Sequence, residues 1–361
     1  MKVLHIISSL TAGGAEKLII DSLPIYKQEH IDVDLVVLKD LGKSSIFQNN
    51  LTKKFFGKVN YLSKGTVYNP FLIFKIIRYI KQYDLVHIHL FPAIYWTVLA
   101  KLLLFKNVKL IFTEHNTLNK RRDIKFLKPV EKFIYNKLDF IGCISEATKT
   151  NLIDHLSFKK NNIQVIENGI LLDNFQNLNN VDYNFFDADS FIITQVSSFR
   201  EQKDQPTILR ALKKLPSNFK LLLIGDGHLL ENNIALAKEL GVYNRVKFLG
   251  IRNDIPTLLN YSDVVVLSSN YEGFGLAIVE GMAANKPCIA SNIDGIKQVV
   301  ENYGLLFEVG NQDQLVSHLL ELYTNKDYYN IISKKCFARS VDFDIKNMVR
   351  KYINVYTELV K

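Results

Sequence analysis

Residues Ser268–Ala290, SSNYEGFGLAIVEGMAANKPCIA, decide the fold of this chain. The apolar run just before this stretch, Val264–Leu267, predicts a buried strand, and Leu276–Ala284 predicts an apolar helix. A second strand is predicted at Cys288–Ala290. The turn between the first strand and the helix carries glycines, which let a ligand approach the backbone closely. Its unpaired N–H groups and the positive end of the helix dipole favour an anion, most simply a phosphate.

Two carboxylates bracket this turn. Glu272 lies in the turn itself, and Glu280 lies in the predicted helix, roughly one turn past its start. Ionised carboxylates only accept hydrogen bonds, so beside an anion they suit hydroxyls better than phosphate. The pattern therefore fits a ligand with a central diphosphate and a hydroxyl-rich sugar at each end, which describes a nucleotide-sugar. The alternative is that Glu272 complements the helix dipole and Glu280 belongs to a solvated helix face, although its apolar neighbours make an unpartnered charge costly there.

The spacing of the two glutamates, with seven residues between them in EGFGLAIVEGMA, resembles the signature of glycosyltransferase family 4. That resemblance implies an α/β fold of the GT-B type, in which two Rossmann-like domains with parallel sheets face a cleft. It also implies metal-independent, retaining transfer from a nucleotide-sugar. In that family pattern Glu272 orients the sugar hydroxyls and Glu280 the ribose hydroxyls, while the N–H groups of Phe274, Gly275 and Leu276 hold the diphosphate.

Two positions extend the resemblance into the first half of the chain. Gly13 and Gly14 follow a predicted strand at Val3–Ile7 and resemble the family's GGAE turn, which comes close to the transferred sugar and the diphosphate. Their alternative role is a tight turn that packs a helix on a strand. His115 follows a predicted strand at Lys109–Phe112, at the end where α/β sheets gather ligands. It resembles a family histidine beside the donor sugar and acceptor, the alternative being a structural loop residue.

Four further sites belong to the second half of the chain. Lys203 stands where the family keeps a lysine that neutralises the diphosphate, whereas Ser197–Ser198 replace the family's usual Gly-Arg. Arg200, two positions later, either reaches the same phosphate or lies at the surface. The turn at Gly225–Asp226 and the side chain of Arg252 are, by the same resemblance, expected beside the nucleotide and its base, although any tight turn has this sequence character.

Alternate histidines at His87 and His89 lie on one predicted strand and point the same way, as two metal ligands would. No third ligand stands at a recognisable spacing, so we interpret them as polar residues lining the carboxyl end of that strand. The Asp-x-Asp patterns at 32–34 and 187–189 open a strand and lie in a polar linker, respectively. We therefore expect neither a metal nor another cofactor.

The order of predicted elements divides the chain into four parts. Residues 1–170 are predicted to form an N-terminal Rossmann-like domain on the acceptor side, and the polar residues 171–189 a linker. Residues 190–342 are predicted to form the donor-side domain. By the resemblance, residues 343–361 form a last helix that crosses back to the first domain. A chain of 361 residues is long enough for two such cores.

Composition narrows the class of protein and its partners. The chain carries a net charge of +9, which would suit nucleic acid, anionic lipid or a phosphorylated substrate. The most basic region, Asn119–Lys137, is either a segment on an anionic membrane or a solvated helix face. The longest apolar run, Leu90–Phe105, falls short of the ~20 residues of a membrane span. Three scattered cysteines and the absence of a secretory signal indicate a cytoplasmic protein, free or at the inner face of the plasma membrane.

We therefore expect a hexosyltransferase that moves a sugar from a nucleotide diphosphate sugar, UDP-linked by preference, to a hydroxyl of a growing glycan, free or lipid-linked, in bacterial surface polysaccharide synthesis. A GT-B nucleotide-sugar epimerase or phosphorylase is an alternative, which product analysis with and without an acceptor would distinguish. A basic nucleic-acid-binding protein is another, but no binding module is recognisable, so nucleic acid is not an expected partner.

Overall fold

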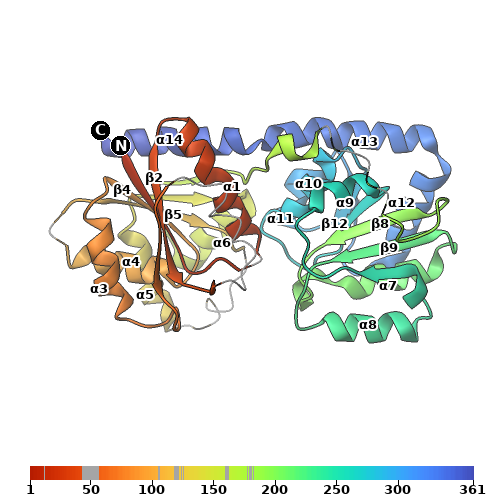
Figure 1. Cartoon of the computed structure of the whole chain (residues 1–361), viewed down its shortest axis with the longest axis horizontal. Coiled ribbons are helices and arrows are strands. Elements are labelled where there is room, and N and C mark those ends of the chain that lie inside the picture. Colours follow the sequence, from red (N-terminus) through yellow and green to blue (C-terminus); the bar gives the residue numbers. More distant parts are fainter. Residues whose placement is uncertain are drawn as a thin grey trace. The chain divides into compact units, whose positions relative to one another are not determined.

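The computed structural model describes residues 1–11, 13–42, 57–104, 106–117, 122, 124, 126–158, 162–176, 178, 181 and 183–361. They form two compact units, one of Met1–Gly169 with Ile345–Lys361 and one of Ile170–Asp344, each a parallel sheet with helices on both sides (Figure 1). Where residues 171–189 are described, they belong to the second unit. The stretch Gly42–Phe56, which the sequence left unassigned, lies outside the described residues except for Gly42.

The first unit is built on a seven-stranded parallel sheet with the order β3-β2-β1-β4-β5-β6-β7. Its central strands are nearly continuous apolar runs, as expected for parallel strands that are covered on both faces. The exceptions among these apolar residues include buried polar side chains on three central strands: His5 on β1, His87 and His89 on β4, and Glu114 on β5. The strands are β1 (Lys2–Ile7), β2 (Asp32–Lys39), β3 (Val59–Ser63), β4 (Leu85–His89), β5 (Lys109–Glu114), β6 (Phe140–Cys143) and β7 (Ile163–Val165).

Helices cover both faces of this sheet (Figure 1). The last helix of the chain packs against α1 on one face, and α3, α4, α5 and α6 follow one another on the opposite face, as right-handed crossovers require. Ser145 caps α6 by accepting a hydrogen bond from the Thr148 N–H, and serine is among the residue types that favour this position. The helices are α1 (Gly14–Gln28), α3 (Leu72–Ile80), α4 (Ala93–Leu102), α5 (Leu127–Asn136), α6 (Glu146–Leu156) and α14 (Ile345–Val360).

The second unit is built on a six-stranded parallel sheet with the order β10-β9-β8-β11-β12-β13. The order reverses direction at β8, which is where ligands gather in sheets of this type. Its strands are β8 (Phe191–Val196), β9 (Phe219–Ile224), β10 (Val246–Phe248), β11 (Val264–Leu267), β12 (Cys288–Ser291) and β13 (Leu305–Phe307). Its α-helices are α7 (Gln205–Lys214), α8 (Leu230–Glu239), α9 (Ile255–Tyr261), α10 (Leu276–Ala283), α11 (Asp294–Val300), α12 (Gln312–Thr324) and α13 (Lys326–Ser340).

Several elements differ from the sequence prediction. From its Asn, Asp and Gly residues, the segment 291–296 would be expected to form a loop, but α11 already begins at Asp294. The strand β3 and the helix α8 were not predicted, because neither has a strong apolar period. β5 continues to Glu114, two residues beyond its predicted end, because Thr113 and Glu114 find buried partners. All three cysteines are buried and reduced, as the sequence indicated.

Candidate active site

In the second unit, two loops at the carboxyl ends of neighbouring strands are bonded to each other. The loop after β11 contributes the N–H of Asn270, which donates to the Gln202 carbonyl (2.8 Å), and its side-chain amide, which donates to the Glu201 carbonyl (2.7 Å). In return, Gln202 Nε2 donates to the Tyr271 carbonyl (3.0 Å). β8 pairs with β11, so the sheet itself brings these distant segments together.

Two buried polar side chains at the ends of the strands hold the loop after β8 in place. Gln195, on β8, donates through Nε2 to the Lys203 carbonyl (3.0 Å). Ser268, directly after β11, has its Oγ 2.9 Å from Gln195 Oε1 and 2.9 Å from the Asp204 carbonyl. Because buried polar groups need partners, these bonds fix the backbone from which the Lys203 side chain projects. The sequence reasoning missed Gln195 and did not assign a role to Ser268, although a glutamine inside an apolar strand was a usable signal.

The side chains of Lys203 and Glu272 form an ion pair between the two loops. They are only 16% and 15% exposed, so the pair is screened much less than one at the open surface. An ammonium has three N–H donors, and Lys203 can therefore bond an anionic oxygen without leaving Glu272. Two of the predicted site residues are thus brought together by the fold.

The start of α10 offers backbone donors beside this pair. Gly275 has φ +83, a left-handed conformation that favours glycine, and it ends the turn that leads into the helix. Among the described residues, none accepts a hydrogen bond from the N–H groups of Phe274, Gly275 or Leu276. The Phe274 ring itself is buried edge-on against Phe343, so only its backbone faces the turn. Glu280 is 5% exposed, which rules out the solvated helix face.

The first turn of α11 packs against the same turn from the other side. A Cβ added to Gly295 would lie 1.9 Å from the Glu272 carbonyl oxygen, so only glycine fits at this position. The contact fixes the backbone of Glu272 and thereby the carboxylate of the ion pair. No local sequence pattern marks Gly295, because the requirement for glycine comes from packing against Glu272.

The glycines in the turn after β9 are likewise required by close packing against a neighbouring backbone. A Cβ on Gly225 would lie 2.1 Å from the Ser197 carbonyl oxygen, and one on Gly227 would lie 2.4 Å from that of Phe199. The Phe199 N–H donates to the Asp226 carbonyl (3.0 Å). Protein packing alone therefore accounts for both glycines, and a place of this turn beside a nucleotide stays a prediction.

The two predicted arginines differ in their surroundings. Arg252 forms a two-pronged ion pair with Asp254, with distances of 2.8 and 2.5 Å, and Tyr183 also donates to that carboxylate (2.7 Å). The guanidinium lowers the pKa of the Asp254 carboxyl through these bonds. Arg200 is exposed and makes no side-chain bond to another described residue.

In the first unit, Gly13 and Gly14 lie at the junction of β1 and α1. Gly13 is the N-cap of α1, and a Cβ there would lie 2.3 Å from Glu16 Oε2. Thr11 Oγ1 donates to the other carboxylate oxygen of Glu16 (2.5 Å). Gly14 is exposed, and Ala12 lies outside the described residues. The turn therefore packs closely on Glu16 while one of its glycines stays open to solvent.

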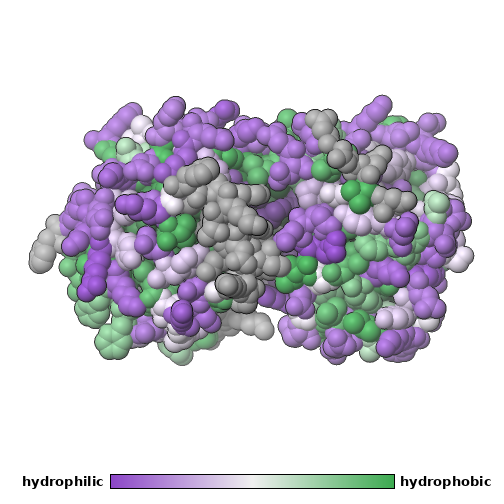
Figure 2. Space-filling view, viewed as in Figure 1, coloured by the Kyte–Doolittle hydropathy of each residue, from purple (hydrophilic) through white to green (hydrophobic). Residues whose placement is uncertain are grey.

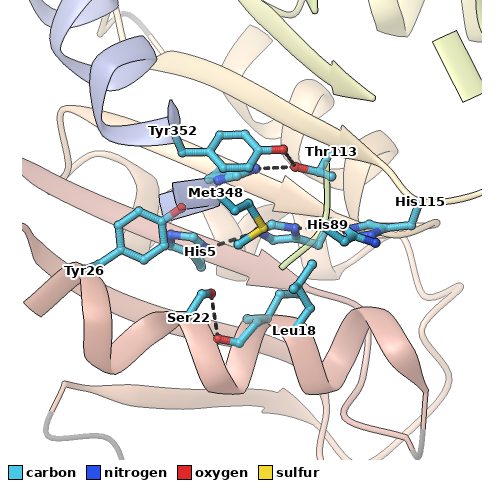
Figure 3. A pocket seen from close by; sticks show the side chains of 12 residues that line it. His5, Leu18, Ser22, Tyr26, His89, Thr113, His115, Met348 and Tyr352 are labelled. Atoms are coloured by element: carbon cyan, nitrogen blue, oxygen red, sulfur yellow. Dashed lines mark hydrogen bonds between the residues drawn. The ribbon is translucent and has the colours of Figure 1, made fainter. Parts of the chain in front are cut away.

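His115 follows β5 and is the outer end of a row of imidazoles (Figure 3). Its Nε2 lies 3.4 Å from His89 Nδ1, and His89 Nε2 lies 3.1 Å from His5 Nδ1. Burial lowers the pKa of His5 to about 3, that of His115 to about 4, and that of His89 well below its usual 6.5. All three rings are therefore neutral at physiological pH.

Neutrality ties the proton positions of these three rings together. A neutral imidazole has one N–H and one bare nitrogen, so His89 must donate to one neighbour and accept from the other. The protons consequently lie on Nδ1 of all three rings or on Nε2 of all three. His115 Nδ1 is the ring nitrogen that does not face His89. Whether it carries a proton is thus coupled to the position of the proton on His5, which is buried in the strand β1.

His87 belongs to a second set of bonds on the same face. Its Nδ1 lies 2.6 Å from the Tyr356 hydroxyl, and its Nε2 lies 2.7 Å from Thr113 Oγ1. Thr113 in turn lies 2.7 Å from the Tyr352 hydroxyl, and Tyr356 donates to Tyr26 (3.2 Å). These bonds join the central strands to α1 and α14.

The nitrogens of His5, His87 and His89 lie within 4.8 Å of one another, which is close enough for three metal ligands. Both nitrogens of His87 are already bonded, and no carboxylate is among the described residues that line the adjoining cavity. That cavity has a volume of about 10 Å³, the space of one water molecule. A divalent charge buried there would lack a counter-charge, so we interpret the cluster as a hydrogen-bond network. The sequence missed His5 because it comes from a different strand.

Within the described ranges, no helix combines the length and the apolar character needed to cross a membrane.

Two family models match this chain. The model "Glycosyltransferase Family 4" matches residues 12–174, and "Glycosyl transferases group 1" matches residues 179–338. The chain belongs to glycosyltransferase family 4. The resemblance deduced from the glutamate spacing is thereby confirmed, and this family 4 enzyme uses nucleotide-sugar donors.

Its relatives extend over the full chain. An Escherichia coli enzyme named UDP-Gal:alpha-D-GlcNAc-diphosphoundecaprenol alpha-1,3-galactosyltransferase is 27% identical, over 100% of this chain and 97% of the relative. A Campylobacter jejuni N-acetylgalactosamine-N,N'-diacetylbacillosaminyl-diphospho-undecaprenol 4-alpha-N-acetylgalactosaminyltransferase is 24% identical, over 95% and 96%.

Solved structures agree on the fold. Anabaena HepE in complex with UDP and glucose has a TM-score of 0.87 at 22% identity over 99% of each chain. Sucrose-phosphate synthase from Thermosynechococcus elongatus has a TM-score of 0.81 at 19% identity, also over 99% of each chain. The predicted fold class, two Rossmann-like domains of the GT-B type, is therefore confirmed.

Proposed function

We propose that this family 4 enzyme transfers a hexose from a UDP-linked donor, with retention at the anomeric carbon, to a hydroxyl of a lipid-linked glycan during bacterial surface polysaccharide synthesis. The observation that carries the proposal is the ion pair of Lys203 and Glu272 beside the unbonded N–H groups at the start of α10. It combines donors for a diphosphate with an acceptor for sugar hydroxyls at one point.

The leaving diphosphate would be stabilised by Lys203 and by the N–H groups of Phe274, Gly275 and Leu276. These groups supply positive charge where negative charge develops in the transition state, so they take the place of a metal ion. Arg200 is exposed and unbonded among the described side chains, so its guanidinium is available for the same phosphates.

The two carboxylates would bind the two sugars of the donor. Glu272 is held by Lys203 and by the packing of Gly295, and it would accept hydrogen bonds from hydroxyls of the transferred sugar. Glu280, buried in α10, would accept from the ribose hydroxyls. Arg252 would lie against the base, and its bonds to Asp254 hold the guanidinium plane.

The acceptor side rests on the first unit and on the relatives. Gly13 and Gly14 would approach the diphosphate and the transferred sugar, and neutral His115 would hydrogen-bond the donor sugar or the acceptor. The Escherichia coli and Campylobacter jejuni relatives are both named for undecaprenol-linked diphosphate substrates and for alpha linkages. These names support a lipid-linked acceptor. The HepE complex supports UDP as the leaving nucleotide.

Lys203→Ala and Glu280→Gln test this assignment. Removing one donor from the developing charge should lower kcat about 100-fold or more in Lys203→Ala. Glu280→Gln should weaken UDP binding about tenfold, because it removes one charged acceptor. The matched control is Lys213→Ala, an exposed lysine on α7, which should leave both quantities unchanged.

Isothermal titration with UDP and turnover of a panel of UDP-hexoses on undecaprenyl-diphosphate-linked glycans would measure both effects, and NMR of the anomeric proton would show the linkage. Wild-type turnover and UDP affinity in both variants would refute the assignment. A sugar product that forms equally without acceptor would instead indicate an epimerase or a phosphorylase.

A further inference from the structure

Two helices on one face of the first sheet expose aromatic side chains to solvent. On α3 and just before it, Phe71 and Phe74 are 70% and 61% exposed. On α5 and just before it, Phe126 and Phe133 are 77% and 47% exposed. Figure 2 shows hydrophobic side chains among hydrophilic ones over the region where Figure 1 places α3. Large aromatic rings that are exposed in clusters mark an interaction site.

The same two helices carry exposed cations and no exposed acid. Over residues 71–81 and 126–137 the only acidic residue is Glu131, which is 2% exposed and bonded to His155 (2.7 Å) and Tyr95 (3.2 Å). Lys137 Nζ lies 5.1 Å from the centre of the Phe133 ring, so cations and rings are interleaved. The exposed cations are Lys75, Arg78, Lys81, Lys128, Lys132 and Lys137.

The two helices face the same way and begin at the same edge of the sheet. α3 packs on α4, and α4 packs on α5, which places both on the face opposite α1 and α14. Each of them leads into the next parallel strand, so their first residues lie at the carboxyl edge of the sheet, where His115 is found. Phe71 and Phe126 therefore stand at the edge to which an acceptor would come.

We propose that these exposed residues of α3 and α5, here called the basic aromatic face, rest on a bilayer that contains anionic lipid. Cations that attract acidic headgroups and aromatic rings that enter the headgroup region are the two contributions an interfacial surface needs. A protein partner would also need shaped pockets, whereas this face is two parallel rows of side chains. This proposal rests on the proposed function in one respect: contact with the bilayer would bring the carboxyl edge of the first sheet to a lipid-linked acceptor.

The sequence indicated Asn119–Lys137 as either a membrane-surface segment or a solvated helix face, and it gave no such indication for α3. Part of that region lies outside the described residues, and its described part supplies only the α5 side of the basic aromatic face. The sequence over Pro70–Tyr83 predicts an amphipathic helix but does not tell which of its apolar side chains are buried. Only the structure shows that α3 buries Leu72, Ile76 and Ile80 and that the rings of Phe71 and Phe74 are turned outward.

Vesicle binding tests the proposal without donor or acceptor, so it stands apart from the transferase assay. The full-length protein would be sedimented with phosphatidylcholine vesicles with and without phosphatidylglycerol. We expect binding only to the mixed vesicles. The double variant Lys128→Gln/Lys132→Gln should bind about 25-fold more weakly, at about fivefold per cation, and Phe71→Ser/Phe74→Ser should bind at least tenfold more weakly.

Two controls match these changes in the second unit. Lys334→Gln/Lys335→Gln removes two exposed cations from α13, and Ile331→Ser/Phe337→Ser removes two exposed apolar side chains from the same helix. Both should bind mixed vesicles like the wild type. The far-UV circular dichroism spectrum and the urea unfolding midpoint, measured on every variant, verify that each is folded without relying on a ligand.

Three results would overturn the proposal: equal binding to vesicles without anionic lipid, equal losses in the α13 variants, or unchanged binding in the variants of α3 and α5. Binding of these cations to DNA in place of vesicles would assign the face to nucleic acid. If vesicle binding behaves as expected while no UDP-sugar is turned over, the docking face stands and the proposed reaction fails.

Discussion

At the residue scale, the candidate site depends on contacts that the local sequence does not encode. Glu272 is held by Lys203, by the backbone contact with Gly295 and by the bonded loops on either side. These contacts come from the segments that follow two other strands, β8 and β12. A carboxylate fixed in this way loses little conformational entropy when it binds a hydroxyl, which is how a rigid site increases affinity.

The buried histidines lead to a prediction about acid stability. Each takes up a proton near pH 6.5 in the unfolded chain but stays neutral in the folded chain, because burial lowers the pKa of His5 to about 3 and of His115 to about 4. The unfolded state therefore binds more protons below pH 6.5, so the free energy of unfolding is largest above that pH and falls as the pH drops toward 4. Each histidine contributes about 1.4 kcal/mol per pH unit in this window.

Urea unfolding between pH 7 and pH 4.5 measures this slope. His5→Phe keeps a planar ring and should reduce the slope by about 1.4 kcal/mol per pH unit. The control is His228→Gln, since the His228 side chain is 61% exposed. An unchanged slope in His5→Phe would mean that His5 is already charged in the folded protein.

At the element scale, α14 stands out, because its residues come last in the chain but complete the core of the first unit. Its tyrosines reach across to the central strands, with Tyr356 on His87 and Tyr352 on Thr113. The helix also packs against α1 (Figure 1). The first unit therefore cannot bury its central imidazoles until the last residues of the chain are in place.

Tyr356→Phe tests this contribution. The change keeps the ring but removes the hydroxyl that lies between His87 and Tyr26, so two buried polar groups lose a partner. We expect the free energy of unfolding to fall by about 1–3 kcal/mol. Asn354→Ala, on the exposed side of the same helix, should change it by less than about 0.5 kcal/mol. Equal effects of the two changes would show that the hydroxyl is not part of the core.

At the scale of the whole molecule, the chain folds into two units with separate sheets and separate site residues. Lys203, Glu272 and Glu280 all lie in the second unit, whereas His115 lies in the first. The nucleotide is therefore expected to stabilise one unit more than the other. Saturation with UDP at about 100 times its Kd adds about 2.7 kcal/mol to the stability of the state that binds it.

Hydrogen exchange measured by mass spectrometry locates this effect. UDP should slow exchange in residues 197–204 and 268–280, and it should leave β1 and β4 of the first unit nearly unchanged. Uridine, which lacks the phosphates, is the control ligand and should give little protection at the start of α10. Protection confined to the first unit would place the nucleotide elsewhere and contradict the proposed site.

Local patterns were sufficient for many of the regular elements, although not for β3 and α8. β11 has the limits that its apolar run predicted, and the last helix, Ile345–Val360, lies within the predicted residues 343–361. Ser145 is of a residue type that favours the N-cap it forms at α6. The family followed from two glutamates at one spacing. These features are encoded within short windows, because strand burial, helix capping and a turn before a helix depend on neighbours in sequence.

The sequence by itself thus determined the class of fold, the family, and the candidates Lys203, Glu272 and Glu280. Only the tertiary structure decided which of them meet, that Gln195 and Ser268 support them, that His5 joins His89 and His115, and which rings of α3 face outward. The physical reason is that these contacts join different strands or opposite sides of a helix. Such pairings depend on sheet order and packing, which no single window of residues contains.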